Sequence, residues 1–327
     1  MKRRALILAL GGGGGALGGS LTAPQALGQT PTAPRRLAVL TVSNETAFAS
    51  SLQGLRDGLR ERGHVEGRDV VIDVRHAGGR VQELPRLAAE LAVLEPVLFV
   101  ATGAAATNAA LTARAEVPVV SLGDLVAAGH AAQLSRPGGR VTGISLLLGP
   151  LNAKRLELLA SVLPKGSAVL NLGDPNSVVG IAPVEAAGRS LGLVLHSAFA
   201  STPAQVDAAF VNARQLRVAG VNVLNSPFLS TQHARIIEQA AVARLPAIYQ
   251  WPETAHDGGL LGYGPSLREM FRQLAGYASR LLGGAQAADM PIEQPTRFTL
   301  VINLKTAKAL GITVPSSLLL RADEVIQ

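Results

Sequence analysis

The sequence predicts an α/β protein of two lobes, each built on a doubly wound parallel sheet and joined by a hinge of several segments. Short apolar runs alternate with segments whose apolar residues recur every three or four positions, as in strands and amphipathic helices. This alternation occurs twice, and Ser135–Gly139 (SRPGG) separates the two halves. Val97–Ala101 is apolar at every position, which is typical of a strand buried on both faces of a parallel sheet.

The composition is that of a packed globular protein. Of the 327 residues, 48% are hydrophobic and 16% are charged, which leaves few side chains for large charged interfaces. The chain has no cysteine, which excludes disulfides, cysteine-based metal sites and a lipid-modified N-terminal cysteine. The net charge is +7, but the basic residues are scattered, so we expect no nucleic-acid partner.

Residues 1–28 are predicted to be a signal peptide for export. Lys2–Arg4 supplies a positive start, Ala5–Leu10 an apolar stretch, and Ala26 and Gly28 the small residues of a cleavage site. Both the Sec and the twin-arginine export routes are open. The apolar stretch is too short to span a membrane, so we expect an exported protein without stable membrane insertion after signal removal. Residues 29–36 are expected to form a linker.

The first half is expected to contain four strands with helices between them, at the apolar runs Leu37–Val42, Asp69–Val74, Val97–Ala101 and Val117–Leu122. A short strand at Val141–Ser145 is expected after the break, in the segment that joins the two halves. Two helices are indicated by apolar residues at helical spacing, namely Phe48, Leu52, Leu55 and Leu59, and then Leu84, Leu87, Leu91 and Leu94. A third helix is expected in the alanine-rich segment 104–113, and a fourth, of about ten residues, after a cap at Gly123-Asp124.

The second half repeats this pattern and is followed by additional segments. Its strands are expected at Ala168–Leu172, Val194–Phe199, Val221–Leu224 and Ala247–Tyr249, with helices near 178–191, 203–217 and 230–243. A strand at Gly258–Tyr263, a helix at Leu267–Leu282, a strand at Phe298–Ile302 and a helix at Leu304–Leu310 come last. We expect these segments to return to both halves, giving a first lobe of 37–142 plus about 264–290 and a second of 143–263 plus about 291–327.

No constellation of catalytic or metal-binding residues stands out. The six histidines show no i,i+4 pair typical of a helical metal site. The chain contains no Gly-x-Ser-x-Gly motif, no Walker loop and no Gly-x-Gly-x-x-Gly after a strand. We therefore expect no metal, no cofactor and no enzymatic activity, although an exported enzyme with catalytic groups from distant segments is an alternative.

Small or polar residues follow the strands, where open α/β sheets bind their ligands. The candidate ligand-binding residues are Ser43, Asn44, Thr102, Gly103, Ala104, Gly123 and Asp124 in the first half and Asn176, Ser226 and Trp251 in the second. We expect Thr102 and Gly103, at the start of a helix, to hold a carboxylate, and Trp251 to pack on the apolar part of the ligand. The alternative is that these residues form helix caps, turns and core.

The C-terminal segment 298–326 has the sequence FTLVINLKTAKALGITVPSSLLLRADEVI. It closely resembles the C-terminal signature of ABC-transporter substrate-binding proteins with the type I periplasmic binding fold, the group that includes tryptophan- and tyrosine-uptake proteins. Shorter pieces agree in order: Gly54-Leu55 with Gly63–Gly67, Leu134–Gly139 with Val141–Gly143, Lys154–Leu159, and Gly258–Leu260 with Tyr263-Gly264. The chain departs from the family at Asp124-Leu125-Val126, where Asp-Pro-Val is usual.

This resemblance implies a periplasmic receptor that captures a small solute between two lobes and delivers it to an ABC permease in the inner membrane. The solute would be an amino acid or another small carboxylate. A sensory binding protein that partners a receptor kinase is the alternative with the same fold. A DNA-binding repressor would require a helix-turn-helix module before the first strand, where this sequence has the predicted signal and linker.

Overall fold

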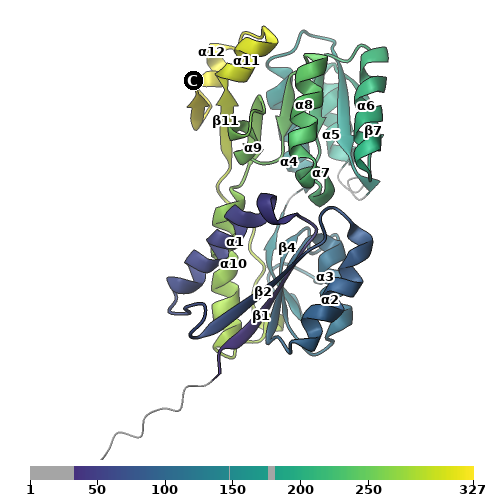
Figure 1. The fold of residues 1–327 in the computed structure, drawn as a ribbon. Helices are drawn as coiled ribbons and strands as arrows, with labels where there is room; N and C mark the ends of the chain where they lie inside the picture. The colour runs from purple at the N-terminus through teal and green to yellow at the C-terminus, as the bar shows by residue number, and fades with distance from the viewer. Residues whose placement is uncertain (1–32, 147, 176–180) are drawn as a thin grey trace, which may run out of the picture. The chain divides into compact units, whose positions relative to one another are not determined.

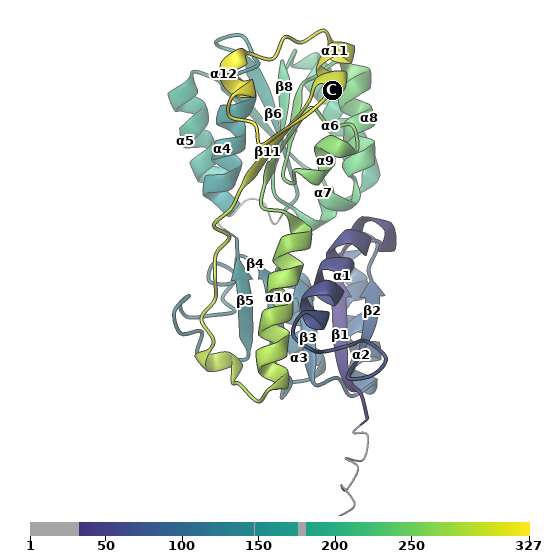
Figure 2. The ribbon, with the colours of Figure 1, turned by 90° about the vertical axis from the view of Figure 1, so that its left-hand side faces the viewer.

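Two β-sheets, each with helices on both faces, make up the protein (Figure 1, Figure 2). The computed structural model describes residues 33–146, 148–175 and 181–327, and Pro34–Gln327 forms one unit by its internal contacts. The predicted signal peptide, residues 29–32 of the predicted linker and Asn176 lie outside the described residues. We call each sheet with its helices a lobe.

The first sheet has five parallel strands in the order β2-β1-β3-β4-β5. They are β1 (Arg35–Thr41), β2 (Val70–His76), β3 (Leu98–Thr102), β4 (Val119–Gly123) and β5 (Val141–Ser145). Helices α1 (Glu45–Arg60) and α10 (Leu267–Leu282) lie side by side on one face, and α2 (Leu84–Val93) and α3 (Gly103–Ala113) cover the other (Figure 1, Figure 2). The apolar run in β3 is fully buried between these layers, which confirms the prediction of a central strand.

Close packing of α1 on α10 depends on two glycines of α1. A Cβ atom on Gly54 would lie 2.2 Å from the Arg268 carbonyl oxygen, and one on Gly58 would lie 2.5 Å from the Arg272 carbonyl oxygen. Because neither residue carries a side chain, α1 and α10 can pack closely. Helix α10 thereby joins the first lobe although it follows the second along the sequence.

The second sheet has seven strands in the order β12-β11-β10-β9-β8-β6-β7, and only β10 and β11 pair antiparallel. They are β6 (Ala168–Gly173), β7 (Val194–Phe199), β8 (Gly220–Val223), β9 (Ala247–Tyr249), β10 (Leu261–Gly264), β11 (Thr299–Asn303) and β12 (Glu324–Ile326). The longer helices are α4 (Leu148–Ala160), α5 (Ile181–Leu191), α6 (Pro203–Gln215) and α8 (His233–Ala243). The shorter ones are α7 (Pro227–Thr231), α9 (Glu253–His256), α11 (Leu304–Leu310) and α12 (Ser316–Leu319).

The described chain passes between the two sheets at three connections, which confirms the hinge of several segments. They lie between β5 and α4, between β10 and α10, and between the 3-10 helix η3 (Ala287–Asp289) and β11. The first and third are tied together, because the Ser145 N–H donates to the Glu293 carbonyl at 2.8 Å. The exact division into lobes stays a prediction, while the pairing of β5 with β4 extends the first sheet to Ser145.

Several sequence predictions of single elements are wrong. The helix expected after Asp124 does not form: the N–H groups of His130 and Ala131 both donate to the Leu125 carbonyl, and Gly129, with φ of +73°, ends the turn. The helix expected near 230–243 is present as α8, with the short helix α7 before it, whereas α4 and β12 were not predicted.

Candidate ligand-binding site

In the first sheet the order in which the chain adds strands reverses between β1 and β3. Open α/β sheets bind ligands at such a switch point. The chain proceeds from β1 to β2 on one side and from β3 to β4 on the other. Thr41 and Thr102 end these two strands, and the Thr102 hydroxyl donates to Thr41 Oγ1 at 2.9 Å. Two hydroxyls that share one hydrogen bond retain one proton for another acceptor.

Helix α3 begins at this point without a side-chain cap. Thr102 occupies its N-cap position and makes no capping hydrogen bond, whereas Asn44 caps α1 by accepting the Ala47 N–H at 2.8 Å. The first N–H groups of a helix have no partner within the helix, and they carry partial positive charge. Gly103 has φ of +79°, and a Cβ on Gly123 would lie 3.5 Å from the Gly103 Cα, so β3 and β4 end against each other. This edge therefore has the groups needed to bind an anion.

Three further predicted residues on this edge are already engaged in local hydrogen bonds. The Ser43 N–H donates to Thr41 Oγ1 at 3.1 Å, and Asn44 is the cap of α1. Asp124 Oδ1 accepts the Ala127 N–H at 3.3 Å. Caps and turns account for these contacts, as the alternative interpretation of the sequence expected. Ala104, in the first turn of α3, is exposed.

In the second sheet the strand order reverses between β6 and β8. The polar groups at this switch point form a buried network. The Ser226 hydroxyl donates to Asp174 Oδ2 at 2.7 Å and accepts the Leu229 N–H at 3.1 Å, which caps α7. The Gln250 side chain accepts the Ser226 N–H at 2.8 Å and donates to the Ser226 carbonyl at 3.1 Å. Ser226, Asp174 and Gln250 are each at most 4% exposed. These bonds hold α7 firmly at the edge of the sheet.

Trp251 follows Gln250 and is largely covered by protein. Its side chain belongs to a core cluster that includes Leu146 and Phe271, and it is 9% exposed. Its indole N–H donates to Ser230 Oγ at 3.0 Å. That this ring packs on a ligand stays a prediction, and the structure shows that the ring fills the core near the connections between the lobes.

The edges of the two sheets meet at α7. A Cβ on Gly103 would lie 3.1 Å from Pro227 Cγ, and a Cβ on Gly79 would lie 3.1 Å from Thr231 Oγ1. The structure thus brings Gly103, which follows Thr102 and lies beside Gly123, close to the helix that Ser226 caps. The roles of all the predicted residues in binding stay predictions.

Sequence reasoning missed Thr41, Gly79 and Pro227. Thr41 lies inside the apolar run predicted as a strand, so its position hid the hydroxyl pair that it forms with Thr102. The other two residues matter because they contact the opposite lobe, and no local pattern in the sequence signals such a contact.

His76 ends β2 on the same edge of the first sheet. Its ring packs edge-on against Phe48 with the ring centres 5.6 Å apart, and its Nδ1 atom is buried without a hydrogen-bond partner among the described residues. Burial lowers the pKa of His76 below 6.5, although the Glu45 carboxylate and a hydrogen bond with the Ser43 backbone act in the opposite direction. The ring is therefore neutral near neutral pH.

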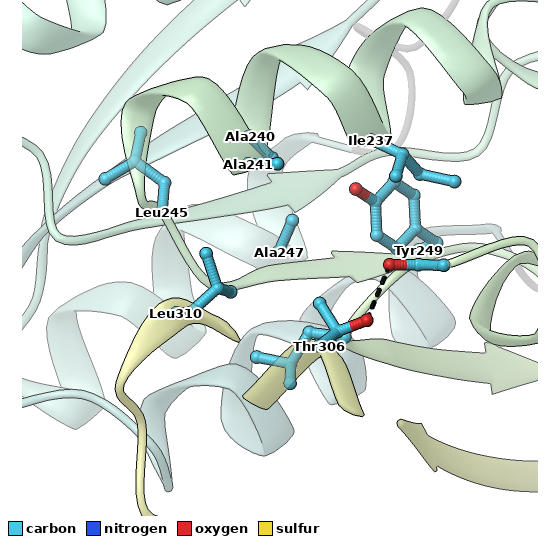
Figure 3. A pocket seen from close by; sticks show the side chains of 10 residues that line it. Ile237, Ala240, Ala241, Leu245, Ala247, Tyr249, Thr306 and Leu310 are labelled. Atoms are coloured by element: carbon cyan, nitrogen blue, oxygen red, sulfur yellow. Dashed lines mark hydrogen bonds between the residues drawn. The ribbon is translucent and has the colours of Figure 1, made fainter. Parts of the chain in front are cut away.

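Two cavities lie away from this site. One, in the second lobe, is lined by Ile237, Leu245, Tyr249 and Leu310 among others, and its volume of about 20 Å³ suits roughly one water molecule (Figure 3). The other, about 230 Å³, lies beside Glu157 and Lys165. Within the part of the chain that the structure describes, no three His, Cys, Asp or Glu side chains are grouped as metal ligands, and no helix has the length and apolar character to span a membrane.

Comparison with known proteins identifies relatives for nearly the whole chain. Residues 36–326 match the model of a family described as ABC transporter substrate binding protein. The tyrosine-binding protein of Clostridioides difficile (strain R20291) is 23% identical over 268 residues, which cover 80% of this chain and 76% of that protein.

Solved structures show the same fold. A conserved domain protein from Vibrio cholerae has a TM-score of 0.82 at 25% identity, over 89% of this chain and 99% of the other. An ABC domain from Streptococcus pneumoniae in complex with L-Trp has a TM-score of 0.82 at 22% identity, over 90% of this chain and 100% of the other. A solute-binding protein from Agrobacterium vitis bound to α-D-tagatopyranose has a TM-score of 0.63 at 14% identity, over 84% and 96% of the two chains.

Proposed function

This chain belongs to the family of ABC transporter substrate-binding proteins, and we propose that it captures a small solute where the carboxyl edges of its two sheets meet. The observation that carries the proposal is the pair of switch points, one in each sheet, with polar groups at both. The contact of Gly103 with Pro227 supports a ligand that touches both edges.

The first edge binds an anionic group of the solute. The N–H groups at the start of α3 receive a carboxylate beside Thr102, Gly103 and Ala104, and the spare proton of the Thr41–Thr102 pair adds one hydrogen bond. Lack of a side chain at Gly103 and Gly123 lets the ligand approach the backbone. Ser43, Asn44 and Asp124 flank this position at the ends of neighbouring strands.

The second edge completes the site with Asn176, Ser226 and Trp251. An amino acid suits the first edge, because the uncapped helix attracts its carboxylate. The names of two similar proteins, a tyrosine-binding protein and a domain in complex with L-Trp, favour the same class. Another small carboxylate that lacks the ammonium group is the second candidate.

In the cell, residues 1–28 direct export by the Sec or the twin-arginine route, and the protein acts in the periplasm as a receptor for an ABC permease. The two lobes, 37–142 plus about 264–290 and 143–263 plus about 291–327, close on the solute about the three connections. A sensory protein that presents the same solute to a receptor kinase is the alternative role.

A thermal-shift screen tests capture of a solute. Purified protein is scanned with amino acids, aromatic acids, purines and short peptides, and a ligand at 100 times its dissociation constant is expected to add about 2.7 kcal/mol to the free energy of unfolding. Titration calorimetry then measures the affinity for each hit. A screen in which amino acids and other carboxylates all leave the melting temperature unchanged contradicts the proposal.

An uptake assay distinguishes a role in transport from the sensory alternative. Deleting the gene is expected to abolish uptake of the radiolabelled hit, and expression of the protein is expected to restore it. N-terminal sequencing of the periplasmic form is expected to begin near Gln29. Normal uptake in the deletion strain favours the sensory alternative.

A further inference from the structure

We infer that Gly79 and Gly103 are positioning residues that set how closely α7 approaches the first lobe, and thereby determine the closed conformation. The inference rests on the proposed function, because closure matters only if the two edges share a solute. A Cβ on Gly103 would lie 3.1 Å from Pro227 Cγ. A Cβ on Gly79 would lie 3.1 Å from Thr231 Oγ1 and 3.7 Å from Phe228 Cδ2. Both glycines therefore face the same helix of the second lobe.

Neither glycine can move away easily, because the backbone around each is anchored in the first lobe. The Gly79 N–H donates to the Val42 carbonyl at 2.7 Å, and the Gly78 N–H donates to the Ser43 carbonyl at 3.3 Å. The Gly103 carbonyl accepts the Thr107 hydroxyl at 2.9 Å, and Gly123 lies directly beside Gly103.

Helix α7 is anchored equally well on its own side. Ser226 ties its start to Asp174 and Gln250, and the Thr231 hydroxyl donates to the Phe228 carbonyl at 2.7 Å. Phe228 and Leu229 are buried in the core of the second lobe. A new side chain on the first lobe therefore displaces the whole of α7 instead of being absorbed by local movement.

Differences of less than about 1 Å in contact distance decide the effect of a new methyl group. Carbon atoms attract each other at separations of about 3.5–4.0 Å, so a Cβ on Gly103 at 3.1 Å pushes on Pro227 Cγ. A Cβ on Gly79 at 3.1 Å from Thr231 Oγ1 also lies inside the usual carbon–oxygen contact distance of about 3.3–3.6 Å. Separation of the lobes relieves this contact, and so we expect G79A and G103A to shift the population toward an open conformation. Apparent affinity falls in proportion, because the apparent dissociation constant scales inversely with the closed fraction.

The chain supplies matched controls for the backbone strain that alanine introduces at positive φ. Gly79 and Gly103 have φ of +83° and +79°, while Gly67 and Gly63 have φ of +85° and +84° with no atom within 4 Å of an added Cβ. G67A and G63A therefore impose the same strain without touching α7. All four glycines belong to the first lobe, so their effects on its stability are comparable.

Closure is measured by pulsed electron resonance between two spin labels. The chain has no cysteine, so A49C on α1 and A234C on α8, both at exposed positions, carry the labels without further changes. G79A and G103A are expected to shift the distance distribution away from that of the parent, while G67A and G63A leave it unchanged. Calorimetry with L-tryptophan as the probe is expected to show an affinity about tenfold lower for G79A than for G67A, matching a tenfold smaller closed fraction.

The two measurements separate this inference from the proposed function. Identical distance distributions in G79A, G103A and their controls overturn the inference, and so do equal affinities of G79A and G67A for a solute that the parent binds. A distribution that responds to G79A and G103A in a protein that binds no solute sustains the inference about closure and overturns the proposed function. Circular dichroism melting of all four variants confirms that each compared pair is equally folded.

Discussion

The carboxyl edges of the two sheets share one topology but use their polar groups differently. In the first lobe Thr102 is partly exposed and its hydroxyl bonds to that of the buried Thr41, and α3 starts without a side-chain cap. In the second lobe Ser226 is buried, caps α7 and is bonded to Asp174 and Gln250. The first edge therefore has groups available for a ligand, whereas the hydrogen bonds of the second edge hold α7 in place.

The largest expected effect concerns Trp251, which the sequence assigns to the ligand and the structure also places in a core cluster. Trp251→Ala is expected to lower the free energy of unfolding by about 3–5 kcal/mol, because it removes a large buried side chain. Urea unfolding followed by circular dichroism measures this, since the variant lacks the chain's only tryptophan.

Trp251→Phe is the matched control for this substitution. It keeps an aromatic ring but loses the hydrogen bond to Ser230, and it is expected to cost about 1 kcal/mol for that bond, with some further loss from the smaller ring. If Trp251→Ala retains full stability and instead loses affinity for L-tryptophan, the ring serves the ligand and the structural role assigned here is wrong.

The next largest effect tests whether the polar groups of the second edge stabilise the fold by holding α7 in place. Ser226→Ala removes both the cap of α7 and a hydrogen bond to the buried Asp174 carboxylate, and it is expected to destabilise the protein by about 2–3 kcal/mol. Thr202, the exposed cap of α6, accepts the Gln205 N–H at 3.3 Å and provides the control. Thr202→Ala is expected to cost about 1 kcal/mol, and equal losses in the two variants would contradict a special role for the second edge.

These two predictions show where sequence reasoning succeeds and where it ends. The strands at Val141–Ser145, Val194–Phe199 and Ala247–Tyr249 and the helix at Leu267–Leu282 were predicted with the bounds that the structure has. Each strand begins shortly after a Gly or Pro, namely Gly139, Gly192 and Pro246, and the apolar residues of the helix recur at helical spacing. Local patterns therefore sufficed for these elements.

Helix α4 was missed because tertiary contacts override its local pattern. Gly149 and Pro150 at its start suggest a turn, and its buried face includes Asn152 and Arg155. The Arg155 guanidinium donates to Asn152 Oδ1 at 2.6 Å and to the carbonyls of Gln250 and Tyr263, and burial lowers its pKa to about 9. A fully buried arginine that bonds to distant carbonyls breaks the apolar periodicity on which the prediction of helices depends.

The candidate site was predictable only in part, for a similar reason. A position after a strand is a local feature, and it identified Thr102 and Gly103 at the switch point of the first sheet. The bond of Thr102 to Thr41 depends on the order of the strands, and the contact of Gly103 with Pro227 depends on how two parts of the chain distant in sequence pack together. Neither is encoded in a short segment.

A smaller effect tests whether the first edge is the one that serves the ligand. Thr102→Val is expected to reduce the free energy of binding L-tryptophan by about 1–2 kcal/mol, the value of one hydrogen bond whose partner is left unpaired. The control is Thr112→Val on the same helix, where an exposed hydroxyl donates to the Asn108 carbonyl at 2.9 Å. Calorimetry on both variants measures the difference. Equal affinity in the two variants would show that the hydroxyl pair only holds β1 and β3 together.

The smallest expected effect is a dependence of stability on pH that originates in the first lobe. Burial lowers the pKa of His76, which ends β2, and of His130, which follows β4, below the ordinary value of 6.5. In the unfolded chain both rings take up a proton near that value, so unfolding binds protons and is favoured by acid. The stability that the neutral rings contribute is complete above about pH 6.5 and is lost as the pH falls through the lowered folded values. Urea unfolding between about pH 7.5 and pH 5 is therefore expected to show a decline that His76→Gln and His130→Gln each reduce and Thr112→Val does not. A decline that neither histidine variant alters would assign the acid sensitivity to other groups and remove this distinction between the two lobes.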